Sequence, residues 1–133
     1  MKMDLSEGII GAAIAVHREL GPGFLESVYE NALVIELQSI GLKVEQQKEF
    51  AIYYQQRQIG LHRLDLLVND HFIIELKTVE TLAAIHFATV RSYLKATNLS
   101  DALILNFATS PLTIKRVGKT REINPPPDFP SQK

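Results

Sequence analysis

The sequence contains no cysteine among its 133 residues, so we expect neither disulfides nor thiolate zinc sites. It also has no hydrophobic run long enough to cross a membrane, and its N-terminus lacks the pattern of a secretory signal. These absences predict a cytoplasmic protein with no membrane partner.

The chain also has little net charge, because 14 Lys and Arg residues are set against 15 Asp and Glu residues. Proteins that bind nucleic acid by bulk electrostatics are strongly basic. Nucleic-acid binding by this chain would therefore need a local basic patch, a metal ion or a partner. The hydrophobic content of 46% and the charged content of 22% are ordinary for a globular domain of this length.

Hydrophobic periodicity and turn signals predict three helices and five strands in the order α-α-β-β-β-α-β-β. A helix between two strands implies a parallel pair, so we expect one α/β domain with a mixed sheet flanked by helices. The domain would span residues 1–122, and the Pro-rich residues 123–133 would form an extended or disordered tail. The expected helices cover residues 5–20, 25–40 and 81–96, and the expected strands cover residues 43–54, 58–68, 72–78, 102–107 and 112–117.

Acidic residues interrupt two neighbouring strands of this pattern, at Asp65 and Glu75. A hairpin must match apolar face to apolar face, because a slip of one residue turns every side chain over. A three-residue loop at 69–71, with a left-handed residue near its end, satisfies this rule. It places Asp65 opposite Glu75 and Arg63 opposite Lys77. Directly opposed residues have Cβ atoms about 4.5–5.5 Å apart.

Two carboxylates this close repel each other unless a cation lies between them. Mg²⁺ fits such a site, because it prefers oxygen ligands and uses one or two carboxylates with water and phosphate. Lys77 would then lie where it could act on a metal-activated water. The alternative is a salt-bridge cluster on a solvated face. Leu67 and Ile73 share that face, however, which indicates that it is partly covered.

A second cluster of distinctive residues lies near the start of the second expected helix, where the sequence reads Gly23-x-x-Glu26-x-x-Tyr29. Glu26 falls in the first turn, where the helix dipole favours an anion. Tyr29 lies about one turn further on the same side. Its plain alternative role is core packing with a satisfied hydroxyl group.

Together these segments resemble a known family. Asp65 followed by Glu75-Leu76-Lys77 is similar to the D…ExK signature of the PD-(D/E)XK nuclease superfamily. The upstream G-x-x-E-x-x-Y segment resembles the motif of the small bacterial GxxExxY family within it. The resemblance covers roughly residues 5–117 and implies a restriction-endonuclease-like core.

The resemblance also implies roles for individual residues. Asp65 and Glu75, with the main-chain carbonyl of Leu76, would bind Mg²⁺ or Mn²⁺. Glu26 would support this metal or a second ion. Lys77 would act on the attacking water, so the catalytic set would be Asp65, Glu75, Lys77 and Glu26.

Relatives often carry Gln-x-x-x-Tyr on the helix after the ExK strand. The matching residues here are Thr89 and Tyr93, so the tyrosine is kept and the glutamine is replaced. Threonine is shorter and offers one hydroxyl in place of an amide, which affects substrate positioning rather than metal binding. Tyr93, Thr89, Arg63 and Tyr29 are the predicted substrate-binding residues.

The predicted function is therefore a metal-dependent nuclease, a hydrolase that cuts nucleic-acid phosphodiester bonds. We expect DNA rather than RNA as its partner, with a second copy of the chain or a protein partner helping to grip a duplex. The alternative is a non-catalytic module that binds nucleic acid or protein on the same fold. The near-neutral charge and the replaced glutamine favour that alternative.

Overall fold

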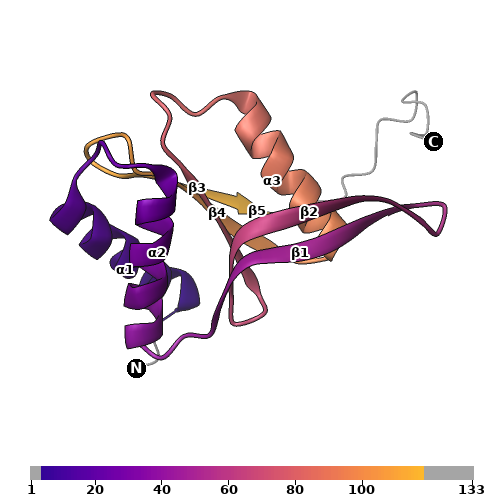
Figure 1. Cartoon of the computed structure of the whole chain (residues 1–133), viewed down its shortest axis with the longest axis horizontal. Helices are drawn as coiled ribbons and strands as arrows, with labels where there is room; N and C mark the ends of the chain where they lie inside the picture. The colour runs from indigo at the N-terminus through magenta and orange to yellow at the C-terminus, as the bar shows by residue number, and fades with distance from the viewer. Residues whose placement is uncertain (1–3, 119–133) are drawn as a thin grey trace.

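The helices and strands follow the predicted order in a computed structural model that describes residues 4–118. The predicted tail at 123–133 lies outside the described residues. Among the described helices, none is long and apolar enough to span a membrane. The elements are α1 (Leu5–Leu20), α2 (Glu26–Ser39), β1 (Val44–Tyr54), β2 (Arg57–Val68), β3 (Phe72–Lys77), α3 (Ala84–Thr97), β4 (Asp101–Asn106) and β5 (Thr113–Gly118) (Figure 1).

The five strands form one mixed sheet in the order β1-β2-β3-β4-β5. Strands β3 and β4 are parallel and are joined through α3, whereas every other neighbouring pair is antiparallel. Strand β5 lies at the edge, as expected. The predicted α/β class and mixed sheet are therefore confirmed.

Helices cover both faces of the sheet (Figure 1). Alternate strand residues point to opposite faces, so the sheet contributes to two cores. Helices α1 and α2 pack on one face, where Leu66, Val68, Ile74 and Leu76 contribute to the larger core. Helix α3 packs on the other face with Val90 and Leu94.

The β2–β3 hairpin has the predicted three-residue loop, because Val68 pairs with Phe72 across residues 69–71. The prediction of a left-handed residue near the end of the loop is wrong. The left-handed residues are the first two, Asn69 (φ 52°) and Asp70 (φ 56°). Asn and Asp tolerate this conformation better than other non-glycine residues. The turn closes with a 3.0 Å bond from the His71 N–H to the Val68 carbonyl.

The hairpin ladder is shorter than predicted, because β2 and β3 pair only at residues 66–68 and 72–74. The predicted pairing of Arg63 with Lys77 is therefore wrong. Arg63 instead lies opposite Glu49 on β1. The first half of β2 separates from β3 and remains paired with β1 alone.

Side-chain alternation also breaks near Asp65. The pattern predicts that Leu64, Leu66 and Val68 share a face. In the structure Leu64 packs in the core beneath α3, whereas Leu66 and Val68 pack against α1 and α2. The β1–β2 ladder has no pair at Gln47, whose left-handed backbone (φ 51°) lies opposite Asp65 in the register. The break in the β1–β2 ladder at Gln47 thus coincides with the point where the side chains of β2 change from one face of the sheet to the other.

Beyond this point β1 and β2 form a hairpin that projects from the body of the protein (Figure 1). Tyr54 pairs with Arg57 across a two-residue turn, and β2 contains one extra residue at Ile59. The hairpin carries exposed Tyr53, Tyr54 and Ile59 side chains. Most side chains of this hairpin are exposed, and α3 packs against its base.

Tyr29 fixes the turn between α1 and α2 from inside the core. Its ring has no exposed surface and stacks on Phe107 with a centroid distance of 4.6 Å. Its hydroxyl donates to the Gly21 carbonyl and accepts from the Phe24 N–H at 3.0 Å. The backbone at Gly23 has a φ of +117°, which favours glycine. The predicted substrate contact by Tyr29 is therefore wrong, and the alternative role in packing describes it.

Tyr29→Phe should lower the free energy of unfolding by about 1 kcal/mol, because it removes the two turn hydrogen bonds and keeps the ring. Tyr29→Ala should cost about 3–5 kcal/mol, because it also empties the ring's place in the core. Urea denaturation followed by circular dichroism measures both values. A Tyr29→Phe protein as stable as wild type would contradict this account of the turn.

Candidate active site

The carboxylates of Asp65 and Glu75 cross between β2 and β3 where the two strands separate. The Asp65 N–H donates to Glu75 Oε2 at 2.9 Å, and the Leu76 N–H donates to Asp65 Oδ2 at 2.9 Å. Each side chain thus occupies a backbone donor of the opposite strand. The arrangement holds both carboxylates in fixed positions on adjacent strands.

The surroundings of both carboxylates raise their pKa values and so disfavour the ionised forms. Glu75 is only 6% exposed, and burial, followed by the charge of Asp65, raises the pKa of Glu75 to about 8. Burial also raises the pKa of Asp65, although the hydrogen bond from Leu76 opposes the change. A buried carboxylate pair of this kind requires a neutralising partner when it is ionised.

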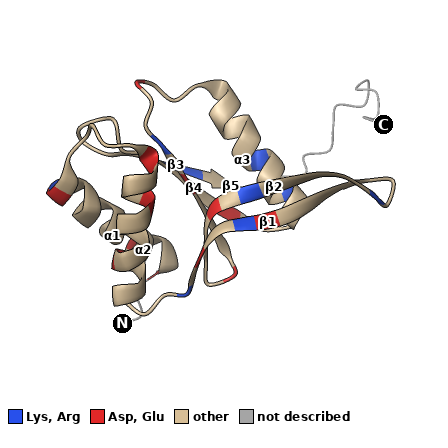
Figure 2. Cartoon of the chain, viewed as in Figure 1, with Lys and Arg blue, Asp and Glu red and all other residues tan. Residues whose placement is uncertain are grey.

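Helix α2 brings two further carboxylates to the same region. Glu26 is its first residue, and burial, followed by the charge of Asp65, raises the Glu26 pKa. Glu30 lies one turn later and is 7% exposed. Figure 2 shows acidic positions on α2 where it faces the start of the β1–β2 hairpin.

Sequence reasoning missed Glu30 and its partner Gln47. The Gln47 amide donates to the Glu30 carboxylate at 3.1 Å, and a further hydrogen bond from Gln47 lowers the pKa of Asp65. The spacing of Glu30, four residues after Glu26 on one helix face, was the available signal. No sequence pattern indicates that Gln47 would leave the regular strand conformation.

Lys77 supplies the positive charge nearest to these groups. Burial raises the pKa of Glu26, Asp65 and Glu75, and the Lys77 ammonium opposes that rise, yet among residues 4–118 it forms no ion pair. Its backbone is fixed, because the Lys77 carbonyl accepts from the Phe107 N–H at 2.9 Å. Its charge is therefore available to a bound group.

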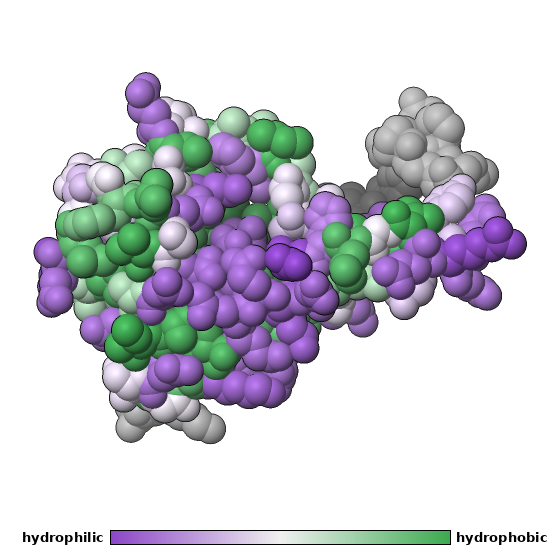
Figure 3. Space-filling view, in the orientation of Figure 1, coloured by the Kyte–Doolittle hydropathy of each residue, from purple (hydrophilic) through white to green (hydrophobic). Residues whose placement is uncertain are grey.

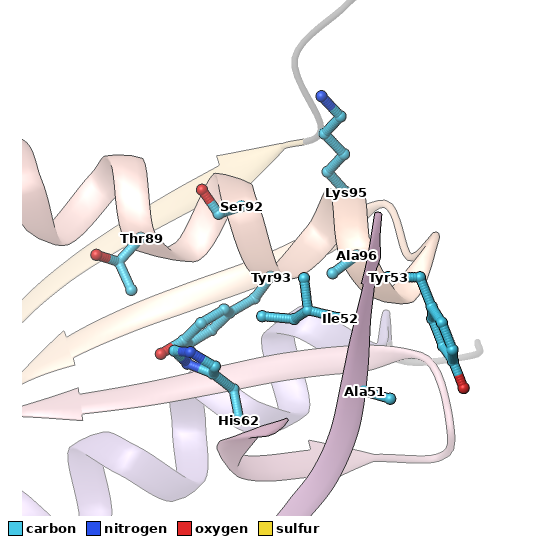
Figure 4. Close-up of a pocket in the computed structure, with 9 residues that line it drawn as sticks. All are labelled: Ala51, Ile52, Tyr53, His62, Thr89, Ser92, Tyr93, Lys95 and Ala96. Carbon is cyan, nitrogen blue, oxygen red and sulfur yellow. The ribbon is translucent and has the colours of Figure 1, made fainter. Parts of the chain in front are cut away.

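Two of the predicted substrate-binding residues lie on one face of α3. Tyr93 packs its ring against Phe50 and His62 at centroid distances of 5.3 and 5.8 Å. Burial, followed by the charges of Glu75 and Asp65, raises the pKa of Tyr93. Tyr93 also packs against the core cluster that contains Leu64, which precedes Asp65 on β2. Thr89 lines the same groove as Tyr93 (Figure 4).

Arg63 lies apart from this group. Its guanidinium forms an exposed ion pair with Glu49 at 3.3 Å. The structure therefore brings together Asp65, Glu75, Lys77, Glu26 and Tyr93, whereas Arg63 is paired with Glu49 on β1.

The available ligands suit a hard divalent cation. The carboxylates of Asp65 and Glu75 are oxygen donors that need neutralisation, and the Leu76 carbonyl belongs to the same strand segment. Within the described chain, no three or more His, Asp or Glu side chains are grouped closely enough to hold a metal by themselves. Mg²⁺ does not require three, because it commonly takes one or two carboxylates and completes its shell with water and phosphate. Glu26 therefore lies outside the immediate carboxylate pair.

Comparison with known proteins agrees with this geometry. The family model of the PD-(D/E)XK nuclease superfamily matches residues 3–117. The crystal structure of SSO0001 is similar with a TM-score of 0.51 and 13% identity, over 86% of this chain and 61% of that chain. No curated protein matches the chain. The structural likeness concerns the fold alone and is consistent with a restriction-endonuclease-like arrangement. On the family match, the chain belongs to the PD-(D/E)XK nuclease superfamily.

Proposed function

We propose that this protein is a metal-dependent nuclease of the GxxExxY group that hydrolyses phosphodiester bonds in nucleic acid, with DNA as the first substrate to test. The observation that carries the proposal is the pair of partly buried Asp65 and buried Glu75 beside the Lys77 ammonium, which forms no ion pair with residues 4–118. A structural ion-pair cluster would match its charges, whereas this site leaves a negative excess that a cation would balance.

In this proposal Asp65, Glu75 and the Leu76 carbonyl hold Mg²⁺ or Mn²⁺. Such an ion lowers the pKa of bound water and offsets charge on the scissile phosphate. The hydrogen bonds from the Asp65 and Leu76 N–H groups keep the two carboxylates in position. Binding therefore needs little reorganisation of the protein.

Lys77 acts on the water or on the charge that develops during its attack. It belongs to the same strand as Glu75, and its fixed backbone keeps the ammonium close to the carboxylates. The Tyr93 hydroxyl contributes a donor on the α3 side of the site. Glu26 adds negative charge that supports the cation from α2.

A second candidate function is nucleic-acid binding without hydrolysis. Thr89 is the observation that favours it, because the glutamine often found at this place in relatives is absent. Thr89 lines the groove beside α3. A cleavage assay separates the two functions.

Lys77→Ala should reduce cleavage of DNA or RNA by roughly 10²–10⁴-fold in Mg²⁺ or Mn²⁺, because the group acting on water is lost. Arg63→Ala is the matched control, since Arg63 is a cation outside the site, and its rate should stay within a few fold of wild type. Gel assays with labelled oligonucleotides measure the rates. Wild-type protein that cuts no faster than Lys77→Ala would leave the binding function in place of the nuclease.

The protein should bind Mn²⁺ saturably, and Asp65→Asn should abolish this binding because it removes one of two anionic ligands. Asp70→Asn is the control. It makes the same chemical change at an exposed residue that pairs with Lys43. Isothermal titration calorimetry measures both. Unchanged affinity in the Asp65→Asn protein would place the metal elsewhere.

Glu75→Gln should raise the free energy of unfolding by a few kcal/mol at pH 8 without metal, because it removes a buried charge. The Glu75 pKa rises from 4.5 to about 8 on folding, so the folded state binds this proton more tightly. The stability that the proton contributes is complete below pH 4.5 and is lost as the pH rises through 8. The gain from Glu75→Gln should therefore shrink towards pH 5. Urea denaturation across this range measures it, and a gain independent of pH would contradict the assignment.

A further inference from the structure

A groove runs between α3 and the projecting β1–β2 hairpin, with a volume of about 580 Å³. That volume falls within the range of pockets that hold small organic groups. Its lining comes from three segments far apart in the sequence: Ala51, Ile52 and Tyr53 from β1, His62 from β2, and Thr89, Ser92, Tyr93, Lys95 and Ala96 from α3 (Figure 4).

The floor of the groove is aromatic and apolar, and its rim is polar. The rings of His62 and Tyr93 lie together beside the Ile52 side chain, whereas the Lys95 ammonium is directed away from them (Figure 4). Aromatic rings within the groove and a lysine at its rim suit a ligand that has an aromatic group at one end and a phosphate at the other. A nucleotide has both groups.

The charged residues of the two stretches of chain that flank the groove are all basic. Helix α3 contains Arg91 and Lys95 and no acidic residue, and residues 51–62 contain Arg57 and no acidic residue. None of these three cations has an ion-pair partner among the described residues. Of these three cations Lys95 lines the groove, and the other two lie elsewhere on α3 and on the hairpin, whose Lys and Arg positions are marked in Figure 2. On the face shown in Figure 3, hydrophobic residues also appear on the hairpin.

The groove adjoins the candidate active site through Tyr93. Tyr93 lines the groove and packs against the core cluster that contains Leu64, the residue before Asp65 on β2. Burial, followed by the charges of Glu75 and Asp65, raises the pKa of Tyr93, in keeping with that placement. A chain that passed along the groove would thus approach the carboxylates. This proximity is what distinguishes the groove from the other hollows of the surface.

We propose that the groove binds an unpaired segment of nucleic acid next to the scissile phosphate, so that the substrate of this protein is single-stranded or has a single-stranded flank. The inference rests on the proposed nuclease function for its link to cleavage. Binding in the groove is a separate property that can be measured without cleavage.

Base accessibility favours an unpaired segment over a duplex. Aromatic side chains stack on bases whose faces are free, and a duplex hides those faces in its own stack. Duplex binding relies instead on many phosphate contacts. One lysine at the groove and two arginines elsewhere on the flanking elements are few for that purpose, whereas the ring-lined floor offers the surface that a free base uses.

The test compares a single strand and a duplex of the same sequence by fluorescence anisotropy, using the full chain in buffer with Ca²⁺ to suppress turnover. Wild-type protein should bind the single strand roughly tenfold or more tightly. Tyr53→Ala should weaken single-strand binding several-fold. Tyr54→Ala is its matched control, because Tyr54 is adjacent and equally exposed (64% against 63%) and does not line the groove.

A second pair of variants tests the phosphate contact. Lys95→Gln should reduce the slope of log Kd against log salt by about 0.7, the value for one phosphate contact on a single strand. Lys115→Gln removes another exposed lysine, on β5, and should leave the slope unchanged. Circular dichroism checks that each variant folds.

Equal affinity for duplex and single strand, no binding of either, or equal effects of each variant and its control would overturn the groove assignment. Single-strand binding with these variant effects but without cleavage would support the groove and reject the nuclease. Cleavage that depends on Lys77 without these effects would support the nuclease and reject the groove.

Discussion

The two hydrogen bonds that join Asp65 to the Glu75 carboxylate and to the Leu76 N–H are the constraint from which the rest of the site follows. In each bond a carboxylate accepts from a backbone N–H of the opposite strand. In two regular strands that N–H would donate to a backbone carbonyl instead. The β2–β3 ladder therefore ends there, and the first half of β2 remains with β1 alone. The same interaction thus fixes the carboxylates and releases the arm that forms one wall of the groove.

This arrangement is costly in the absence of a cation. Burial raises the pKa of Asp65, Glu75 and Glu26. The charge of Asp65 raises the pKa of Glu75 and of Glu26 further, and the charge of Glu30 raises that of Asp65. Lys77 and the Gln47 amide offset only part of this repulsion. A protein selected for stability alone has little reason to gather these groups, and buried charges of one sign are found where a site uses them. The energetic cost is thus an argument for function that does not depend on the family motif.

Sequence periodicity predicted the regular parts of the fold and failed where side chains replaced backbone contacts. Matching the apolar faces was enough to place Asp65 level with Glu75 and to choose the three-residue loop. The same rule wrongly extended the ladder to Arg63 and Lys77, because it assumes continuous strands. Gln47 has a left-handed backbone, and its side chain bonds to Glu30, which lies 17 positions earlier in the chain. This contact forms only when α2 packs against β1, so the sequence of either segment alone does not reveal it.

Thr89 shows how a departure from a family pattern can change meaning once the fold is known. From the sequence alone, Thr89 meant that the glutamine amide that would position the substrate is missing. In the structure Thr89 lines the groove beside Tyr93, where a glutamine would extend further into the same space. The shorter side chain therefore exchanges a hydrogen-bonding group for room along the ring-lined floor. Positioning by stacked bases needs that room, so the feature that weakened the case for a typical nuclease site supports one that takes an unpaired strand.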